Sequence, residues 1–450
     1  MTTLITNGTV ITRNDTQPFI QNGAVAFEGQ HITAVGTTKE LKAQFPHADT
    51  IDAKGRLVMP GFINTHMHYY STFARGINFN SKPALTFGDV LEGLWWKLDK
   101  MLTLDDVYYS AVGPMIDAVR MGVTSVIDHH ASPYAVQGSL FKIAQAAQQI
   151  GIRSNLCYEI SDRDGADIAH QGIQENIDFI KHCQQRQQQQ DNPQKDMLGG
   201  LVGMHAQMTI SQKTLDAVVQ AAEDAGAGYH IHAAEGPEDV QDCTSTYHQR
   251  VIERLHANRI LNQRSLIIHC VHINNHEIEL LAQSGVAVIN APESNMSNAV
   301  GCSPVLKLLE AGALVGMGTD GYCVDMTQSL RAVHAIQKHQ AQIPSVAWAE
   351  PHTMLFQNNA TIFNRHIQGQ VGILKPGAYA DIIIVDYQAP TPITADTVAS
   401  HLLFGVNGRQ VDTTVINGRV IMRQRELQGI DEDQLMAKSR EQAAKLWARI

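Results

Sequence analysis

Two histidines one residue apart, His66 and His68, are the residues best placed to do chemistry, and they follow the apolar run Leu57–Met59. On a β-strand, residues i and i+2 point to the same face, so both imidazoles can face one ion. Imidazole nitrogen is a common ligand for zinc and similar divalent metals. Two histidines do not complete such a site, so other parts of the chain must supply the remaining ligands.

Further metal-ligand candidates stand at the ends of apolar runs, and they are His232, His269 and Asp320. Together with the first pair they form a set of nitrogen and oxygen donors that suits Zn²⁺ or Fe²⁺. Glu235 lies three residues after His232. A carboxylate at that place can face an activated water and move its proton without binding the metal. The pattern therefore predicts metal-assisted hydrolysis.

The central part of the chain must bring these residues together, and in it short apolar runs alternate with longer helical stretches, as in βα units. The candidate strands are Phe62–His66, Ser125–His129, Ile152–Tyr158, Leu201–Met204, Tyr229–His232, Ser265–His269, Ala287–Asn290 and Leu314–Gly318. Eight such units predict a closed (β/α)8 TIM barrel of the α/β class, with its active site at the C-terminal ends of the strands. Polar or titratable residues stand at or just after most of those ends, as a shared active site requires.

The two ends of the chain resemble each other. Leu4–Ile11 and Val415–Ile421 each predict a pair of short strands around Asn-Gly, a strong hairpin signal. We therefore expect a composite β-sandwich formed by residues 1–59 and 375–450, beside a catalytic barrel formed by residues 60–374. The last segment, Asp431–Ile450, has helical composition and predicts a terminal helix.

Charge and cysteine content exclude several other functions. The formal net charge of -10 argues against nucleic acid or an anionic membrane as a partner. The six cysteines form no Cys-x-x-Cys pair, which argues against a disulfide framework and predicts a reducing, cytoplasmic compartment. We find neither a signal peptide nor an apolar run near the roughly 20 residues that span a bilayer. The glutamine-rich segment Gln187–Gln190 predicts a solvated loop or a frayed helix end.

Ordered motifs along the chain resemble the amidohydrolase superfamily. They are Pro60–His68, His232–Glu235, His269-Cys270, Gly318–Asp320 and Gly377–Asp381. Within the superfamily the chain resembles the branch of aminohydrolases and chlorohydrolases that act on heterocycles, which includes triazine hydrolases and guanine deaminases. The segments Leu94–Asp99, Asp128–Pro133 and Ser294–Asn298 resemble, more narrowly, the SsnA-type aminohydrolases. The resemblance spans essentially the whole chain and implies a metal-dependent (β/α)8 barrel with a composite β-sandwich.

The resemblance also implies roles for individual residues. The implied metal ligands are His66, His68, His232 and Asp320, and the implied catalytic residues are Glu235 as proton shuttle, His269 beside the activated water, and Asp320. His205 matches a position after strand 4 that often contacts substrate. Two-metal members carry a bridging lysine at the end of strand 4, and Gly199–His205 contains no lysine. We therefore expect one divalent ion, zinc first and iron as the alternative.

Each of the other candidate substrate contacts could instead have a purely structural role. His129 follows strand 2, where packing and substrate contact are equally open. Glu159 follows strand 3 and either lines the pocket or forms an ion pair at its rim. Trp95 either stacks on the substrate or packs in the core or a lid. Asn295 and Asn298 follow strand 7 and either hydrogen-bond a ring or form a turn.

The reaction that we predict is hydrolytic deamination of an amino-substituted nitrogen heterocycle, such as a purine, pterin or triazine. The same site also allows opening of a cyclic amide or displacement of a halide, which product analysis separates because only deamination releases ammonia. A third alternative is a barrel that binds without catalysis. The expected partner is the small heterocyclic substrate, and the resemblance implies a homo-oligomer, with a dimer favoured.

Overall fold

Parallel strands form the centre of the computed structural model, which describes residues 1–189 and 191–450. One sheet contains β6 (Phe62–Met67), β7 (Val123–His130), β8 (Arg153–Tyr158) and β9 (Leu198–Gly200) in chain order. The other contains β10 (Val202–Ala206), β11 (Tyr229–Ala233), β12 (Leu266–His269), β13 (Ala287–Asn290) and β14 (Leu314–Met317). Bridges between Met67 and Asp320 and between Ile160 and Met204 join the two sheets at both edges. β9 and β10 are one stretch interrupted at Leu201, so the strands of the two sheets occupy the eight strand positions of a barrel. The predicted (β/α)8 barrel is therefore confirmed.

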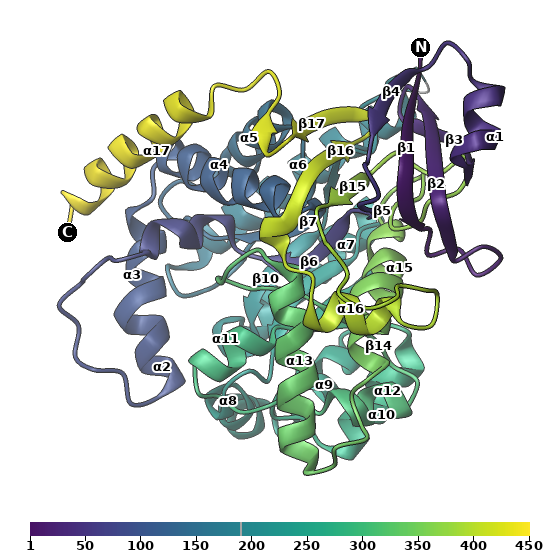
Figure 1. The fold of residues 1–450 in the computed structure, drawn as a ribbon. Helices are drawn as coiled ribbons and strands as arrows, with labels where there is room; N and C mark the ends of the chain where they lie inside the picture. The colour runs from purple at the N-terminus through teal and green to yellow at the C-terminus, as the bar shows by residue number, and fades with distance from the viewer. Residues whose placement is uncertain (190) are drawn as a thin grey trace.

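Helices follow the strands and surround them, as Figure 1 shows. They include α4 (Leu104–Arg120), α5 (Ser139–Ile150), α6 (Ala166–Gln188), α7 (Gln212–Ala225), α8 (Pro237–Tyr247), α9 (Val251–Ala257), α10 (Asn275–Ser284), α11 (Pro292–Ser297), α12 (Val305–Glu310), α13 (Met326–Ala341), α14 (Glu350–His352), η4 (Thr353–Asn358) and α15 (Asn359–Asn364). In α5, the buried residues Leu140, Ile143, Ala147 and Ile150 recur at helical spacing and pack into the main core between helices and strands. The glutamine-rich segment begins in α6, and Gln190 lies outside the described residues. Among the described helices, none combines the length and apolar character of a membrane span.

Strands from both ends of the chain form one further sheet. It contains β1 (Thr2–Ile11), β2 (Phe19–Glu28), β3 (His31–Thr37), β4 (Asp49–Asp52), β5 (Leu57–Pro60), β15 (Ile382–Val385), β16 (Val411–Ile416), β17 (Arg419–Arg423) and β18 (Glu426–Leu427). The antiparallel pair β5 and β15 joins the N-terminal half to the C-terminal half (Figure 1). The composite β domain is therefore present, whereas its division from the barrel at residues 59/60 and 374/375 stays a prediction.

The two Asn-Gly pairs have different structures. Asn417-Gly418 forms the expected hairpin turn, since Ile416 pairs with Arg419 across it. The hairpin predicted around Asn7-Gly8 is wrong, because β1 continues through both residues with a register shift against β2. A side chain at Gly8 would meet Val58 Cγ2 at 2.5 Å, so this glycine allows close strand contact instead of a turn.

The segment that follows β6 crosses over to the barrel's first outer helix through η1 (Tyr69–Ala74), α2 (Phe87–Val90), η2 (Leu91–Trp95) and α3 (Trp96–Met101). The C-terminal helix α17 (Glu432–Trp447) lies against α4 (Figure 1). Trp447 at its end and Arg449 just after it contact the two ends of this segment. Nε1 of Trp447 donates to the carbonyl oxygen of Phe73 at 3.1 Å. Nη2 of Arg449 donates to the carbonyl oxygen of Met101 at 2.9 Å.

These two contacts lead to a prediction about the mobility of residues 75–100. In the double variant Trp447→Phe/Arg449→Gln, we expect their backbone amides to exchange roughly fivefold faster, because about 1 kcal/mol of local stabilisation is lost. Hydrogen exchange measured by mass spectrometry checks this. The matched control is Lys445→Gln, which removes only an exposed ion pair with Glu441 on the same helix. Equal exchange in the double variant and the control would contradict the prediction.

Candidate metal-dependent active site

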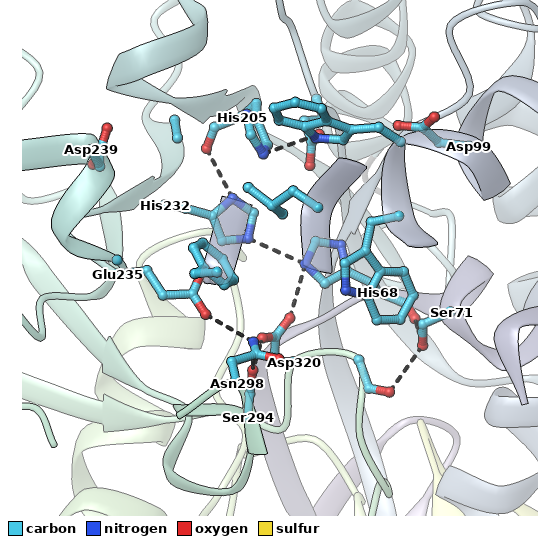
Figure 2. A pocket seen from close by; sticks show the side chains of 18 of the residues that line it. His68, Ser71, Asp99, His205, His232, Glu235, Asp239, Ser294, Asn298 and Asp320 are labelled. Carbon is cyan, nitrogen blue, oxygen red and sulfur yellow. Dashed lines mark hydrogen bonds and ion pairs between the residues drawn. The ribbon is translucent and has the colours of Figure 1, made fainter. Parts of the chain in front are cut away.

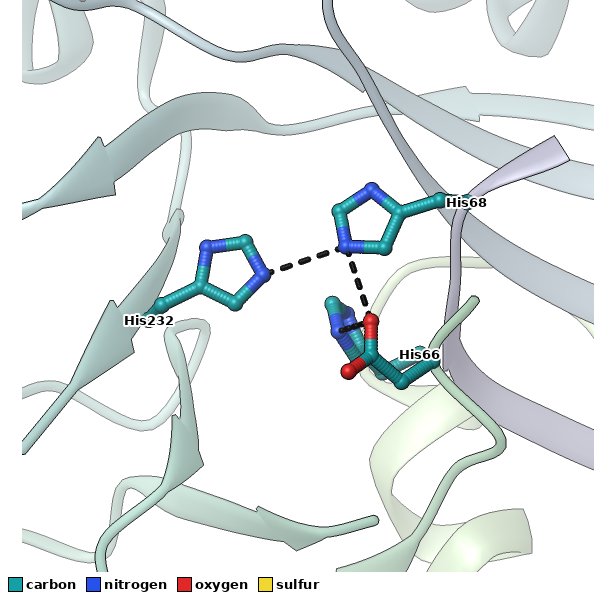
Figure 3. Close-up of side chains that lie close together, drawn as sticks. His66, His68 and His232 are labelled. Atoms are coloured by element: carbon teal, nitrogen blue, oxygen red, sulfur yellow. Dashed lines mark hydrogen bonds and ion pairs between the residues drawn. The ribbon is translucent and has the colours of Figure 1, made fainter. Parts of the chain in front are cut away.

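Side chains from three distant parts of the barrel converge at the C-terminal ends of its strands (Figure 3). His66 lies on β6, His68 directly follows it, His232 lies on β11 and Asp320 follows β14. Nε2 of His68 lies 3.0 Å from Oδ1 of Asp320 and 3.2 Å from Nε2 of His232. One ligand atom from each of the four residues lies within 4.8 Å of the others. The structure thus brings the four predicted metal ligands together.

The outer ring nitrogens of these histidines are already engaged. Nδ1 of His68 donates to the carbonyl oxygen of His129 at 2.6 Å, and Nδ1 of His232 donates to that of His205 at 2.9 Å. A histidine that donates through Nδ1 presents the lone pair of Nε2, which is the form that binds a metal. Nε2 of His66 is buried and has no hydrogen-bond partner. The donor set therefore fits a divalent metal ion.

Electrostatics at the same place favour a cation. Burial lowers the pKa of His66 to about 3, so its imidazole is neutral. Burial also lowers the pKa of His68, but the contact with Asp320 and the nearby carboxylates of Glu159 and Asp128 together outweigh burial and raise that pKa to about 9. Positive charge is thus stabilised between His68 and Asp320, in the middle of the four ligand atoms.

A second group, which shares Asp320, is suited to proton transfer. Nε2 of His269 lies 3.2 Å from Oε2 of Glu235 and 3.9 Å from Oδ2 of Asp320. Burial and the nearby Asp320 raise the pKa of Glu235 well above its ordinary value. Burial also raises the pKa of Asp320, but the contacts and charges of the nearby His66 and His68 together outweigh burial and hold this pKa well below its usual range. Two carboxyl groups with pKa values moved in opposite directions are typical of a catalytic acid and base.

The backbone at these strand ends is unusual. Ala234, His269, Cys270 and Asp320 all have positive φ, at 51°, 72°, 50° and 55°. The left-handed region costs a non-glycine residue roughly 1–3 kcal/mol and is concentrated at functional sites. These turns direct the side chains of the second group toward one another.

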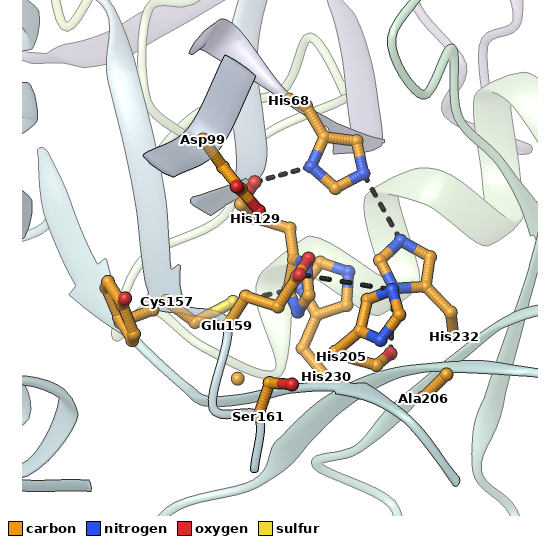
Figure 4. A network of polar contacts seen from close by, with 12 residues as sticks. His68, Asp99, His129, Cys157, Glu159, Ser161, His205, Ala206, His230 and His232 are labelled. Atoms are coloured by element: carbon orange, nitrogen blue, oxygen red, sulfur yellow. Dashed lines mark hydrogen bonds and ion pairs between the residues drawn. The ribbon is translucent and has the colours of Figure 1, made fainter. Parts of the chain in front are cut away.

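A pocket opens beside both groups (Figure 2). Of the candidate substrate contacts, His205, Glu159 and Trp95 line it. Oε2 of Glu159 lies 3.2 Å from Nδ1 of His129, which is fully buried behind it, and Oε1 lies 4.0 Å from Nε2 of His205 (Figure 4). Burial lowers the pKa of both His129 and His205, so the charged partner of Glu159 is Arg163, whose Nη2 lies 4.0 Å from Oε1. Glu159 therefore both lines the pocket and forms an ion pair, and Trp95 packs edge-on against Tyr70 at the pocket wall. Their roles in substrate binding stay predictions.

One wall of the pocket carries a buried ion pair. Nη2 of Arg163 lies 2.7 Å from Oδ2 of Asp99 and 4.0 Å from Oε1 of Glu159. Asp99 and Glu159 line the pocket directly. Two carboxylates thus face one guanidinium, which leaves this wall with an excess of negative charge.

The site also contains residues to which the sequence analysis assigned no role. His230 is buried, and its Nε2 lies 2.9 Å from Nδ1 of His66. The available signal was its position two residues before His232, which places both on one face of β11. Ser294, which was not assigned either, lines the pocket. Of the two expected asparagines, Asn298 lines the pocket, whereas Nδ2 of Asn295 lies 3.0 Å from Nδ1 of His269.

The chain matches known proteins over nearly its whole length. The model of the amidohydrolase family matches residues 57–421, and that of a bacterial imidazolonepropionase-like composite domain matches residues 23–48. A 5-methylthioadenosine/S-adenosylhomocysteine deaminase of Pelotomaculum thermopropionicum is 29% identical over 448 residues, with 98% of each chain covered. A 5'-deoxyadenosine deaminase of Methanosarcina mazei is 30% identical over 453 residues, with 99% of each chain covered.

Solved structures support the same fold. An adenosine deaminase of Xanthomonas campestris with bound zinc has a TM-score of 0.87 and 23% identity, and covers 100% of this chain and 99% of its own. At 23% identity, the structural similarity establishes only a shared fold. Membership of the family is established by the family model, which matches residues 57–421, and by the relative that is 30% identical. The chain belongs to the amidohydrolase family.

Proposed function

We propose that this protein is a metal-dependent deaminase that hydrolyses the amino group of a purine nucleoside or a closely related heterocycle. The observation that carries the proposal is the adjacency of two groups in one pocket. The ligands around His68 and Asp320 lie directly beside the proton-transfer group of Glu235, His269 and Asp320. The deaminases of adenosine-type nucleosides among the relatives support the same reaction.

We further propose one zinc ion, held by His66, His68, His232 and Asp320. A zinc ion at such a site lowers the pKa of a bound water from about 15.7 toward about 7. A single ion is supported by the absence of lysine between Leu198 and Ala206, the region of strand 4. The zinc-bound adenosine deaminase of the same fold supports the choice of metal. A homodimer and a cytoplasmic location also remain predictions.

The residues of the chain move the protons. Oδ2 of Asp320, beside Nε2 of His269, accepts a proton from the attacking water while the oxygen bonds to the substrate carbon. Glu235, protonated because its pKa is raised, delivers its proton from Oε2 to the adjacent ring nitrogen. The new hydroxyl then returns a proton to Glu235 as the carbonyl forms. The amino group takes the proton held by Asp320 and leaves as ammonia.

Ammonia release is the experiment that tests the proposal. With the zinc-loaded protein, we expect ammonia from adenosine, 5'-deoxyadenosine or 5'-methylthioadenosine in a panel that also contains guanine, pterins and aminotriazines. A chlorotriazine and a cyclic amide in the same panel test halide displacement and ring opening, which leave no ammonia. Protein stripped of metal is the control. A fully metal-loaded protein that releases no ammonia from any member would contradict the proposal.

A further inference from the structure

The short helix α11 contacts all three groups to which we assign proton transfer. Oγ of Ser294 donates a hydrogen bond to Oδ2 of Asp320. Nδ2 of Asn295 lies 3.0 Å from Nδ1 of His269. Nδ2 of Asn298, the residue that caps the helix, donates to Oε1 of Glu235 at 3.2 Å (Figure 2).

Each contact fixes which atoms its partner presents to the ligand cluster and to the reaction. Oδ1 of Asp320 faces His66 and His68, at 3.5 and 3.0 Å, while Ser294 holds Oδ2. Oε2 of Glu235 faces His269, while Asn298 holds Oε1. A carboxylate held at one oxygen cannot rotate freely, so these bonds select which oxygen faces the ligand cluster and which faces the substrate.

The helix itself is held firmly. It starts directly after β13 with Pro292 at its first turn, and Ser294 and Asn295 are each only 2% exposed. The backbone N–H of Asn298 donates to the carbonyl oxygen of Ser294 at 2.8 Å, which aligns the two pocket-facing side chains one turn apart. On the outer side, Oγ of Ser329 on α13 donates to Oε2 of Glu293 at 2.6 Å. The three inward-facing side chains are therefore parts of one anchored unit.

We infer that α11 is a positioning helix, in which Ser294 orients Asp320 for metal binding while Asn295 and Asn298 orient His269 and Glu235 for proton transfer. The second half of this inference rests on the proposed deaminase function, whereas the first half concerns metal binding alone. None of the three is a metal ligand, so their effects must pass through the residues that they hold.

Two single variants separate the two halves. In Ser294→Ala, we expect the dissociation constant for zinc to rise about 10- to 100-fold, measured by competition with a chromophoric chelator and without substrate. In Asn298→Ala, we expect kcat to fall at least about 10-fold while KM and the zinc dissociation constant change less than about twofold. Ser294→Thr keeps the hydroxyl and should restore most of the zinc affinity.

Ser297→Ala is the matched control, because Ser297 is an exposed residue of the same helix. Zinc affinity within about threefold of wild type in Ser294→Ala would overturn the metal half, and an unchanged kcat in Asn298→Ala would overturn the proton-transfer half. Should Ser294→Ala fail to fold, as judged by thermal melting, Ser294→Gly replaces it, with the same expected loss, because it also lacks the hydroxyl and adds no metal ligand. If the wild-type protein binds zinc but releases no ammonia, the deaminase proposal fails, and the zinc measurement still decides the role of Ser294.

Discussion

The variant Glu235→Gln is expected to retain its metal and to lose kcat by about 10²–10⁴-fold, the usual contribution of a positioned proton donor. Glutamine keeps the shape of the side chain and an oxygen that can accept from Asn298, but it cannot carry a proton to a ring nitrogen. Glu235 is not among the four residues whose ligand atoms converge around His68, so metal binding should survive. Steady-state ammonia release and the metal content of the purified protein measure the two effects.

Glu238→Gln provides the matched control for this prediction. Glu238 lies three residues further along, in the first turn of α8, and makes no contact with His269 or Asp320 in the described structure. We expect this variant to turn over normally. Activity of Glu235→Gln within about threefold of wild type would refute the assigned role. Loss of the metal together with activity would place Glu235 in metal binding instead.

Discrimination against phosphorylated substrates is the second large effect. We expect kcat/KM for adenosine to exceed that for adenosine 5'-monophosphate by at least about 10²-fold, because opposed like charges in a site cost several kcal/mol. The pocket wall presents Asp99 and Glu159, and the described residues that line it include no arginine or lysine. The guanidinium of Arg163 is paired with Asp99 at 2.7 Å. Burial raises the pKa of Asp99 to about 6, so its carboxylate is ionised at pH 8, where the comparison should be made.

A substitution in the same ion pair tests the cause of this discrimination. Asp99→Asn removes one negative charge and frees Arg163, so the ratio between nucleoside and nucleotide should fall by about tenfold. Asp105→Asn is a control for the same change of net charge at a site outside the pocket lining. If the wild-type protein used both substrates within tenfold of each other, the charge of this wall would not govern specificity.

The positions of the proposed metal ligands illustrate how far sequence reasoning reached. The resemblance to the amidohydrolase superfamily implied which four candidates bind the metal. The candidates themselves, His66, His68, His232, His269 and Asp320, could be named because each stands at the end of an apolar run, and parallel strands of a barrel end on one rim. That argument uses only the period of a strand and the rule for where barrel sites form. It therefore predicts which residues meet, although they are up to 254 positions apart, the difference between positions 66 and 320.

The contacts around those ligands could not be predicted in the same way. Asn295 carries the same amide as a substrate-binding residue would, and only the path of α11 after β13 turns it toward His269. His230 cannot be singled out from the sequence, because a strand histidine is equally suited to core packing. The hairpin predicted at Asn7-Gly8 also depended on tertiary contacts. β1 pairs with β2 on one side and with β4 on the other, and it continues through both residues as one strand.

The sequence by itself determined the class of the fold, the metal-ligand candidates and the candidate for the proton shuttle, because strand periodicity and residue chemistry are local properties. The tertiary structure alone decided which oxygen of each carboxylate faces the ligands, which pKa values rise or fall, and which charges the pocket wall carries. Those properties depend on burial and on partners brought together from different βα units. Asp320 shows the difference, because its carboxyl chemistry is evident in the chain but its low pKa exists only where His66 and His68 meet it.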